Sequence, residues 1–151
     1  MAPEVSELTA HLGYWLRHIS NYVSQAFARK LAVKDVTVAE WALMRVLHDR
    51  EPTSPSQLAN DMGMTRGAIT KLADRLLAKG LIDREASPDD GRSHTLRLTA
   101  QGTDLVPELA VLADENDAEC FAHISDRDRR SMLRILKETV TRLGLTAIPI
   151  D

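Results

Sequence analysis

The feature that most constrains the fold is a pair of helical patterns separated by a short turn. In SPSQLANDMG, Ser54 can cap a helix that has Pro55 at its first position and Gln57 at capping-box spacing. Gly63 can end that helix in a left-handed conformation. A second helical pattern, RGAITKLADRLLAKG, follows Thr65 directly. Two helices joined by roughly three or four residues that include a glycine form a helix-turn-helix motif.

The segments before this motif also have helical spacing. Residues 5–27 place apolar side chains at helical intervals, which predicts a long amphipathic first helix. In TVAEWALMRVL, Thr37 and Glu40 have capping-box spacing. We therefore expect a second helix to begin near Val38.

The segments after the motif predict a hairpin and two more helices. LIDREA and HTLRLT are short β-capable runs with turn residues between them, which predicts a hairpin with its tip at Ser87 to Ser93. Helical periodicity returns after Thr99 and again after a Ser125 cap. The expected fold class is mainly α with a small β-hairpin (α+β), a winged helix-turn-helix flanked by long helices.

Length and composition exclude several classes of protein. A chain of 151 residues with 44% hydrophobic and 27% charged residues fits one globular domain or two closely shared lobes. No apolar run approaches the roughly 20 residues of a membrane span, and the N-terminus lacks signal-peptide features. We therefore expect a cytoplasmic protein without membrane contact. The single cysteine, Cys120, cannot form an internal disulfide or a thiolate zinc site.

No sequence pattern indicates catalysis. The chain has no glycine-rich phosphate loop, nucleophile elbow or paired catalytic carboxylates. Its five histidines have no spacing with carboxylates that would indicate a metal site. We therefore expect a protein that is not an enzyme and that uses no cofactor and no metal.

The second helix of the motif has one apolar and one polar face. At about 100° per residue, Ile69, Leu72 and Leu76 share a narrow face that we expect to be buried. The opposite face combines a glycine, a hydroxyl and charged groups, namely Gly67, Thr70, Lys71 and Asp74, with Arg66 at its edge. Such a face suits a DNA major groove about 12 Å wide, where cations donate to guanine and a threonine bonds a base or touches a thymine methyl.

The hairpin tip offers a second contact with DNA. Arg92 follows Asp90 by two residues, so the carboxylate can orient the guanidinium at the tip. A narrow minor groove has a negative potential that attracts arginine. Cations outnumber carboxylates between residues 66 and 97, whereas residues 104–128 are strongly acidic. This division would discourage DNA from binding the wrong surface.

Three segments carry a resemblance to a known family. DDGRSHTLRLTAQG resembles the wing signature of the MarR family of winged helix-turn-helix transcription regulators, and TRGAITKLADRLLAKGLIDR resembles its recognition helix. TVAEWALMRVL resembles the family more loosely, so the resemblance covers roughly residues 37–102. It implies a DNA-binding winged domain at 36–102 and a helical dimerisation region at 1–35 and 103–151. The expected DNA-binding residues are Thr65, Arg66, Gly67, Thr70, Lys71, Arg75, Asp90 and Arg92.

The resemblance also implies a homodimer that presents two winged domains to a pseudo-palindromic site in double-stranded DNA. In such a dimer the N-terminal helix and the last two helices of each chain interlock. The residues agree, because long apolar stripes with only 4% aromatic residues have little core to pack against in one 151-residue chain. At the C-terminus, Leu145, Ile148 and Ile150 either join this packing or form a disordered tail.

Members of the family commonly sense small aromatic ligands between the dimerisation and DNA-binding lobes. The candidate ligand-binding residues are Tyr14, Arg17, His18 and Tyr22. Trp15 and Trp41 are expected in the core. The expected function is a repressor that a small aromatic ligand releases from DNA. Two alternatives stay open: a winged-helix protein-interaction module without a ligand response, and a redox-responsive regulator that uses Cys120.

Overall fold

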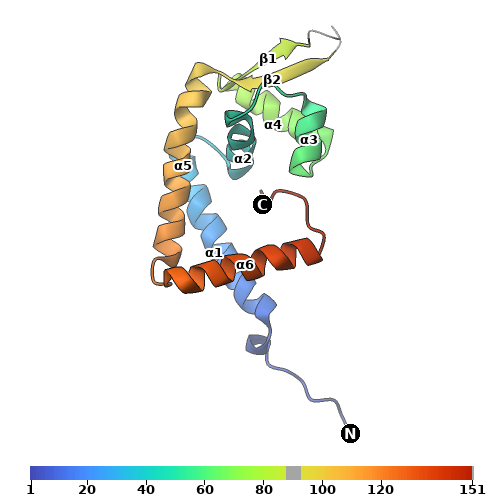
Figure 1. Ribbon diagram of the computed structural model, residues 1–151, viewed down its shortest axis with the longest axis vertical. Helices are drawn as coiled ribbons and strands as arrows, with labels where there is room; N and C mark the ends of the chain where they lie inside the picture. The colour runs from blue at the N-terminus through green and yellow to red at the C-terminus, as the bar shows by residue number, and fades with distance from the viewer. Residues whose placement is uncertain (88–92, 151) are drawn as a thin grey trace.

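The computed structural model describes residues 1–87 and 93–150, which contain six α-helices, a short 3-10 helix and one two-stranded sheet (Figure 1). The elements in chain order are η1 (Leu8–Ala10), α1 (Leu12–Ala32), α2 (Val38–His48), α3 (Pro55–Met62), α4 (Arg66–Ala78), β1 (Ile82–Ala86), β2 (His94–Leu98), α5 (Ala100–Phe121) and α6 (Asp126–Arg142). β1 and β2 pair in antiparallel fashion, with Ile82 opposite Leu98. The expected fold class is confirmed.

The helices α2 to α6 begin at capping side chains, whereas α1 has no side-chain cap. The Glu40 N–H donates to the Thr37 hydroxyl and the Thr37 N–H donates to the Glu40 carboxylate, which closes the predicted capping box of α2. Ser54 caps α3 as expected, but the Gln57 side chain donates to Asp61 further along the helix. Hydroxyls also cap the last three α-helices, at Thr65, Thr99 and Ser125.

Two glycines end the helices of the motif. Gly63 follows α3 with φ 63° and Gly80 follows α4 with φ 71°. This left-handed conformation is disfavoured for residues that carry a Cβ atom. Residues 63–65 connect α3 to α4, so the predicted helix-turn-helix is confirmed.

The hydrophobic core lies between the helix-turn-helix, the hairpin and the neighbouring helices α2 and α5. Ile69, Leu72 and Leu76 of α4 are buried, as the periodicity predicted. Leu96 of β2 is also buried, and outside the hairpin it exchanges two backbone hydrogen bonds of 2.8 and 3.0 Å with Thr53. This bridge fixes the hairpin to the segment that leads into α3. The hairpin and the helix-turn-helix therefore form one winged unit.

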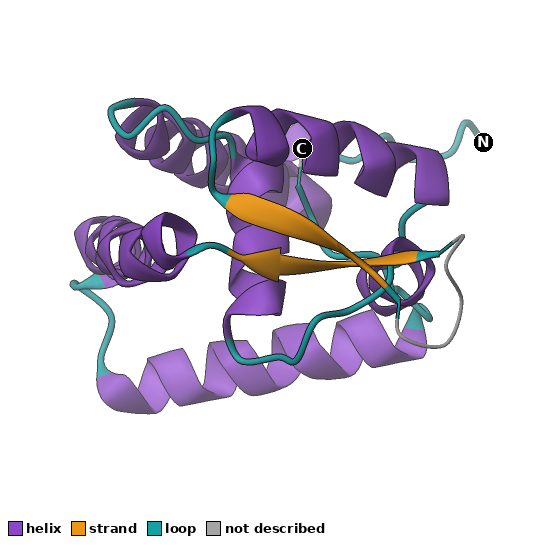
Figure 2. Ribbon diagram, turned by 90° about the horizontal axis from the view of Figure 1, so that it is seen from above, coloured by secondary structure: helices purple, strands orange, loops and turns teal. Residues whose placement is uncertain are grey.

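The helices at the two ends of the chain keep apolar side chains exposed. α1 packs against α5, and α6 crosses beside α1 on the far side of the molecule from the hairpin, with the N-terminal segment extending beyond it (Figure 1). Seen from above, the hairpin lies over the helices (Figure 2). None of the residues of α6, all of which are described, is buried. The exposed apolar side chains include Leu12, Trp15, Leu16 and Ile19 on α1 and Met132, Leu133, Ile135, Leu136 and Val140 on α6.

Two expectations for the N-terminal region are wrong. The first α-helix begins at Leu12, because His11 has extended backbone angles (φ −96°, ψ 129°) that separate α1 from η1. Trp15 is 51% exposed because it belongs to the exposed apolar face of α1, and its indole N–H donates to the Thr9 carbonyl at 2.9 Å. Trp41 does pack against the core, as expected.

Candidate nucleic-acid interface and effector pocket

The second helix of the motif, α4, presents its predicted polar face to solvent. The exposed residues of this recognition face are Thr65, Arg66, Gly67, Thr70, Lys71 and Arg75. A Cβ atom at Gly67 would meet no heavy atom within 4 Å, so the backbone is open to close approach there. An exposed helix face that combines cations, a hydroxyl and accessible backbone has the chemistry for reading a major groove.

The cations of the recognition face keep their charge available. Among the described residues, Arg66, Lys71 and Arg75 have no carboxylate within ion-pair distance. Arg97 in the hairpin, by contrast, lies 2.7 Å from Glu85. The recognition face can therefore meet phosphates or guanine edges without first breaking an ion pair.

Thr70 has a constraint that the sequence pattern did not show. Its hydroxyl donates to the Arg66 carbonyl one turn earlier, at 3.0 Å. The proton is therefore used inside the helix, and at this exposed residue the hydroxyl oxygen remains able to accept a hydrogen bond. This arrangement suits a base amino group or a thymine methyl.

The backbone pairing of the hairpin continues to Ser87 and Ser93, the last described residues before its tip. Ser87 N–H donates to the Ser93 carbonyl at 3.0 Å, next to the last paired residues Ala86 and His94. Asp90 and Arg92 lie outside the described residues. Their contact with a minor groove stays a prediction.

A buried ion pair joins the end of α4 to the start of α2. Glu40 is 1% exposed, and its Oε2 atom lies 2.9 Å from Lys79 Nζ. The hydrogen bond from Nζ goes to Oε1 at 3.3 Å, while Oε2 has no hydrogen-bond donor among the described residues. Burial opposes ionisation, but hydrogen bonds from Lys79 and Thr37 and the Lys79 charge outweigh it and lower the pKa of Glu40. The pair fixes the C-terminal end of the recognition helix.

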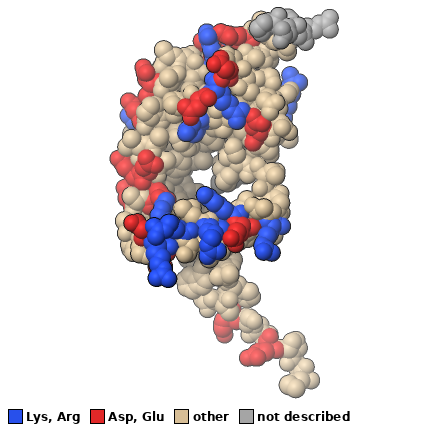
Figure 3. Space-filling model, in the orientation of Figure 1, with Lys and Arg blue, Asp and Glu red and all other residues tan. Residues whose placement is uncertain are grey.

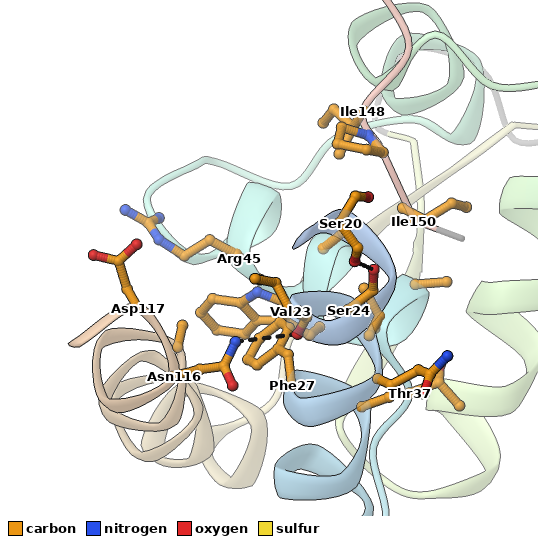
Figure 4. Close-up of a pocket in the computed structure, with 18 of the residues that line it drawn as sticks. Ser20, Val23, Ser24, Phe27, Thr37, Arg45, Asn116, Asp117, Ile148 and Ile150 are labelled. Atoms are coloured by element: carbon orange, nitrogen blue, oxygen red, sulfur yellow. Dashed lines mark hydrogen bonds between the residues drawn. The ribbon is translucent and has the colours of Figure 1, made fainter. Parts of the chain in front are cut away.

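A pocket of about 910 Å³ lies between α1, α2, α5 and the C-terminal tail, residues 145–150 (Figure 4). Its apolar lining includes Val23 and Phe27 of α1, Trp41 of α2 and Ile150 of the tail. A concave, mostly apolar site with a few polar groups is typical of small-molecule binding.

Charged side chains stand at this pocket from three helices. Arg45 of α2 and Asp117 of α5 lie on the same side of it (Figure 4), and Arg45 Nη1 is 3.0 Å from Asp49. Arg75 of the recognition helix also lines the pocket. The predicted DNA-binding helix therefore borders the cavity directly.

One buried amide connects the pocket wall to α1. Asn116 is 4% exposed, and its amide nitrogen donates to the Val23 carbonyl at 3.2 Å. Its oxygen accepts from Lys30 Nζ at 3.0 Å, and Lys30 is also 2.7 Å from Glu119. This network fixes α5 against α1 behind the apolar lining. Neither Arg45 nor Asn116 was identified from the sequence, since nothing in their helices marks them as pocket residues.

The predicted ligand-binding residues lie beside this pocket and are not part of its lining. Tyr14 is half-buried and its ring centroid is 5.1 Å from that of His18, in an edge-to-face contact, while Arg17, His18 and Tyr22 are exposed. The lining on α1 begins at Ser20, about 9 Å along the helix from Tyr14 at about 1.5 Å per residue. Their role in ligand binding stays a prediction.

Three further features concern metal binding, the cysteine and membrane contact. Residues 1–87 and 93–150 contain no group of three or more metal-ligating side chains. Cys120 is half-buried and free. None of the described helices is long and apolar enough to cross a membrane.

Charge is separated between elements. Figure 3 shows Lys and Arg gathered over α6 and acidic side chains along the side where α5 runs. The α5 carboxylates are Asp104, Glu108, Asp114, Glu115, Asp117 and Glu119. The acidic region predicted from the sequence therefore lies mainly on α5, and one of its carboxylates, Asp117, lines the same pocket as Arg75 of α4.

The fold and the recognition face together define a winged helix-turn-helix protein. A model of the MarR family matches residues 36–94. The chain is 30% identical to the HTH-type transcriptional regulator YhbI of Bacillus subtilis over an alignment of 110 residues. This alignment covers 73% of this chain and 71% of YhbI. It is 25% identical to the transcriptional repressor IacR of Pseudomonas putida over an alignment of 124 residues. This alignment covers 82% of this chain and 74% of IacR.

A solved structure shows the same fold over nearly the whole chain. BpsR of Bordetella bronchiseptica, whose DNA binding is regulated by 6-hydroxynicotinic acid, is 19% identical with a TM-score of 0.78, over 90% of this chain and 97% of that one. The protein described here belongs to the MarR family. It is a DNA-binding transcription regulator and not an enzyme.

Proposed function

We propose that this protein is a homodimeric repressor that binds a pseudo-palindromic operator and leaves it when a small aromatic ligand binds. The exposed recognition face of α4, with cations that have no carboxylate partner among the described residues, is the observation that carries the DNA-binding part. The similarity to the repressor IacR supports repression over activation. Such a regulator acts in the cytoplasm, where it meets its operator.

The dimer rests on the apolar faces of α1 and α6. Leu16 and Ile19 on α1 and Leu133 and Leu136 on α6 are each between 42% and 52% exposed. Contiguous exposed apolar surface of this kind marks an interaction site. A second copy of the chain would cover it by symmetry, and residues 1–35 and 103–151 would form the dimerisation region. Two recognition faces would then meet two half-sites.

The pocket between α1, α2 and α5 is the proposed effector site. Its apolar walls fit an aromatic ring, and Arg75, which has no carboxylate partner among the described residues, supplies positive charge for a carboxylate. A ligand held by Arg75 would touch the recognition helix directly. Tyr14 and His18 form the alternative site for the same ligand class, at a surface that a second chain would cover.

A salt titration with random-sequence duplex tests DNA binding. The affinity of a DNA reader falls steeply as the salt concentration rises, because phosphate contacts release counterions. If Lys71 contacts a phosphate, Lys71→Ala should reduce the slope of log affinity against log salt concentration by about one unit. Binding without salt dependence, or no binding at all, would instead favour a protein-interaction module.

The two tryptophans distinguish the two ligand sites. Trp41 lines the pocket, whereas Trp15 lies beside Tyr14 with ring centroids 5.2 Å apart. The chain has two tryptophans, so Trp15→Phe leaves a reporter at the pocket and Trp41→Phe leaves one at the Tyr14 site. Titration with 4-hydroxybenzoate should quench the tryptophan fluorescence of Trp15→Phe and leave the fluorescence of Trp41→Phe unchanged. The reverse pattern would move the effector site to Tyr14 and His18, and no response in either variant would reject 4-hydroxybenzoate as a ligand of either site.

A further inference from the structure

The C-terminal tail returns from α6 to the winged unit. α6 ends at Arg142, and Gly144 reverses the chain with φ 65°. The tail then runs back toward α2 and α3, as Figure 1 shows in red. Its Ile148 N–H donates to the Met62 carbonyl at 3.0 Å. Met62 is the last residue of α3, so the tail is bonded to the start of the turn in the helix-turn-helix.

Gly63 makes room for this contact. A Cβ atom at Gly63 would lie 2.6 Å from the Ala147 Cα and 2.9 Å from the Ala147 N, both of them backbone atoms. Gly144 has nearly the same φ, but a Cβ there would meet nothing within 4 Å. The two glycines therefore share a backbone conformation, and Gly63 alone of this pair is pressed against the tail.

The same tail forms a wall of the pocket. Ile148 packs against the hydrophobic core, and Ile148, Pro149 and Ile150 all line the cavity. Ser20 and Ser24 of α1 line it as well, and the close-up shows Ile150 on the same side as Ser20 (Figure 4). The pocket is therefore complete when the tail is docked.

The tail links parts of the molecule that otherwise touch little. α6 has no buried residue, and Figure 3 shows an opening between α6 and the elements above it. Beyond that opening, the chain reaches the winged unit again at Ala147 and Ile148. A docked tail restrains the winged unit relative to α6, whose exposed apolar face is the proposed dimer surface.

We propose that residues 145–150 are a strap that completes the effector pocket and carries its occupancy to the helix-turn-helix. The proposal rests on the proposed function and deepens it. A ligand that contacts the tail binds the docked state more tightly, so it shifts the equilibrium toward that state. The docked strap connects α6 to the turn that follows α3. It therefore limits how far the two recognition faces of the dimer can move to fit the DNA. By linkage, DNA binding weakens ligand binding by the same factor.

The matched pair Gly63→Ala and Gly144→Ala tests the strap. Both substitutions place a Cβ atom at a residue with left-handed backbone angles, a conformation that L side chains disfavour, so the backbone penalty is matched between them. Gly63→Ala also expels the tail, so the Ile148 amide should lose its protection from hydrogen exchange. In Gly144→Ala that protection should remain. A third variant, Ile150→Ala, removes a wall of the pocket while the Ile148 hydrogen bond stays.

Binding of 1-naphthoate, followed by Trp41 fluorescence in the Trp15→Phe background, measures the consequence. Gly63→Ala and Ile150→Ala should each lower the affinity for naphthoate about tenfold, because each variant loses apolar contact with the ligand worth roughly one buried side chain. Gly144→Ala should bind as the parent does. The ligand should also lower the affinity for operator DNA less in Gly63→Ala than in Gly144→Ala.

Three results would overturn the strap. They are an unprotected Ile148 amide in the parent protein, unchanged naphthoate affinity in Gly63→Ala after the protection is lost, and no naphthoate binding by the parent. DNA binding by the parent is measured alongside by salt titration. Salt-dependent DNA binding together with any of these results removes the strap and leaves the DNA-binding function standing. Loss of DNA binding itself would refute the proposed function.

Discussion

Glu40→Gln should destabilise the protein far more than its small change in shape implies. The side chain keeps its size, but the carboxylate that pairs with Lys79 at 2.9 Å and accepts from the Thr37 N–H loses its charge. Removing one partner of a buried pair costs about 3–5 kcal/mol. Because the Lys79 side chain is 28% exposed and regains some hydration, we expect about 2–4 kcal/mol.

Urea unfolding at a fixed protein concentration measures this loss, and Glu119→Gln is the matched control. Glu119 pairs with Lys30 at 2.7 Å, but its side chain is 63% exposed. Its substitution should cost about 0–1 kcal/mol, the usual range for a surface pair. Equal effects of the two substitutions would refute the reasoning, because burial would then make no difference to the pair.

The pH dependence gives a second check on the same ion pair. The pKa of Glu40 in the folded protein is below its ordinary value, so the unfolded chain binds the proton more readily. The contribution of the carboxylate is therefore fully present above the unfolded pKa of about 4.3 and is lost as the pH falls through the lower folded pKa. The difference between the parent and Glu40→Gln should be constant from pH 6 to 8 and should shrink below about pH 4.3. A stability difference between the parent and Glu40→Gln that grows as the pH falls would contradict the lowered pKa of Glu40.

Three further predictions concern DNA binding and assembly. Arg92→Ala should weaken binding to specific and random duplex alike in a filter-binding assay, whereas Arg127→Ala on α6 should change neither. Thr70→Ala and Lys71→Ala should each relax the preference at particular operator positions by about 1–3 kcal/mol when single-base variants are compared, and equal losses on every sequence would show backbone contact only. Leu136→Arg places a charge on the exposed apolar face of α6 and should shift sedimentation from dimer to monomer, and an unchanged dimer would remove α6 from the interface.

The helix boundaries were predictable because capping is local. Thr37 and Glu40, three residues apart, bond to each other's backbone as the spacing predicted. The burial of Ile69 on α4 followed equally from helical periodicity. The start of α1 was placed too early, since apolar spacing continues through residues 5–11 while the backbone at His11 turns extended.

The pocket was not predictable, because its residues come from segments far apart in the sequence. Arg45, Asn116 and Ile150 meet only through the packing of α1, α2, α5 and the tail. The sequence left two possibilities for the tail, packing or disorder, and its contact with Gly63 depends on where the chain arrives after α6. The expectation that Trp15 lies in the core is wrong because an amphipathic pattern does not tell whether the same chain or a second one covers the face.

The most direct test of the central claim is selection of bound duplexes from a random library by the purified protein. Two recognition faces on a symmetric dimer should recover an inverted repeat whose half-site centres lie about 10–10.5 base pairs apart, or a multiple of that spacing. Sequencing should show the strongest preference at the bases that Thr70 and Lys71 reach, and these positions should relax in the alanine variants. Recovery of no shared sequence, or of a single half-site without symmetry, would contradict a dimeric operator-binding regulator.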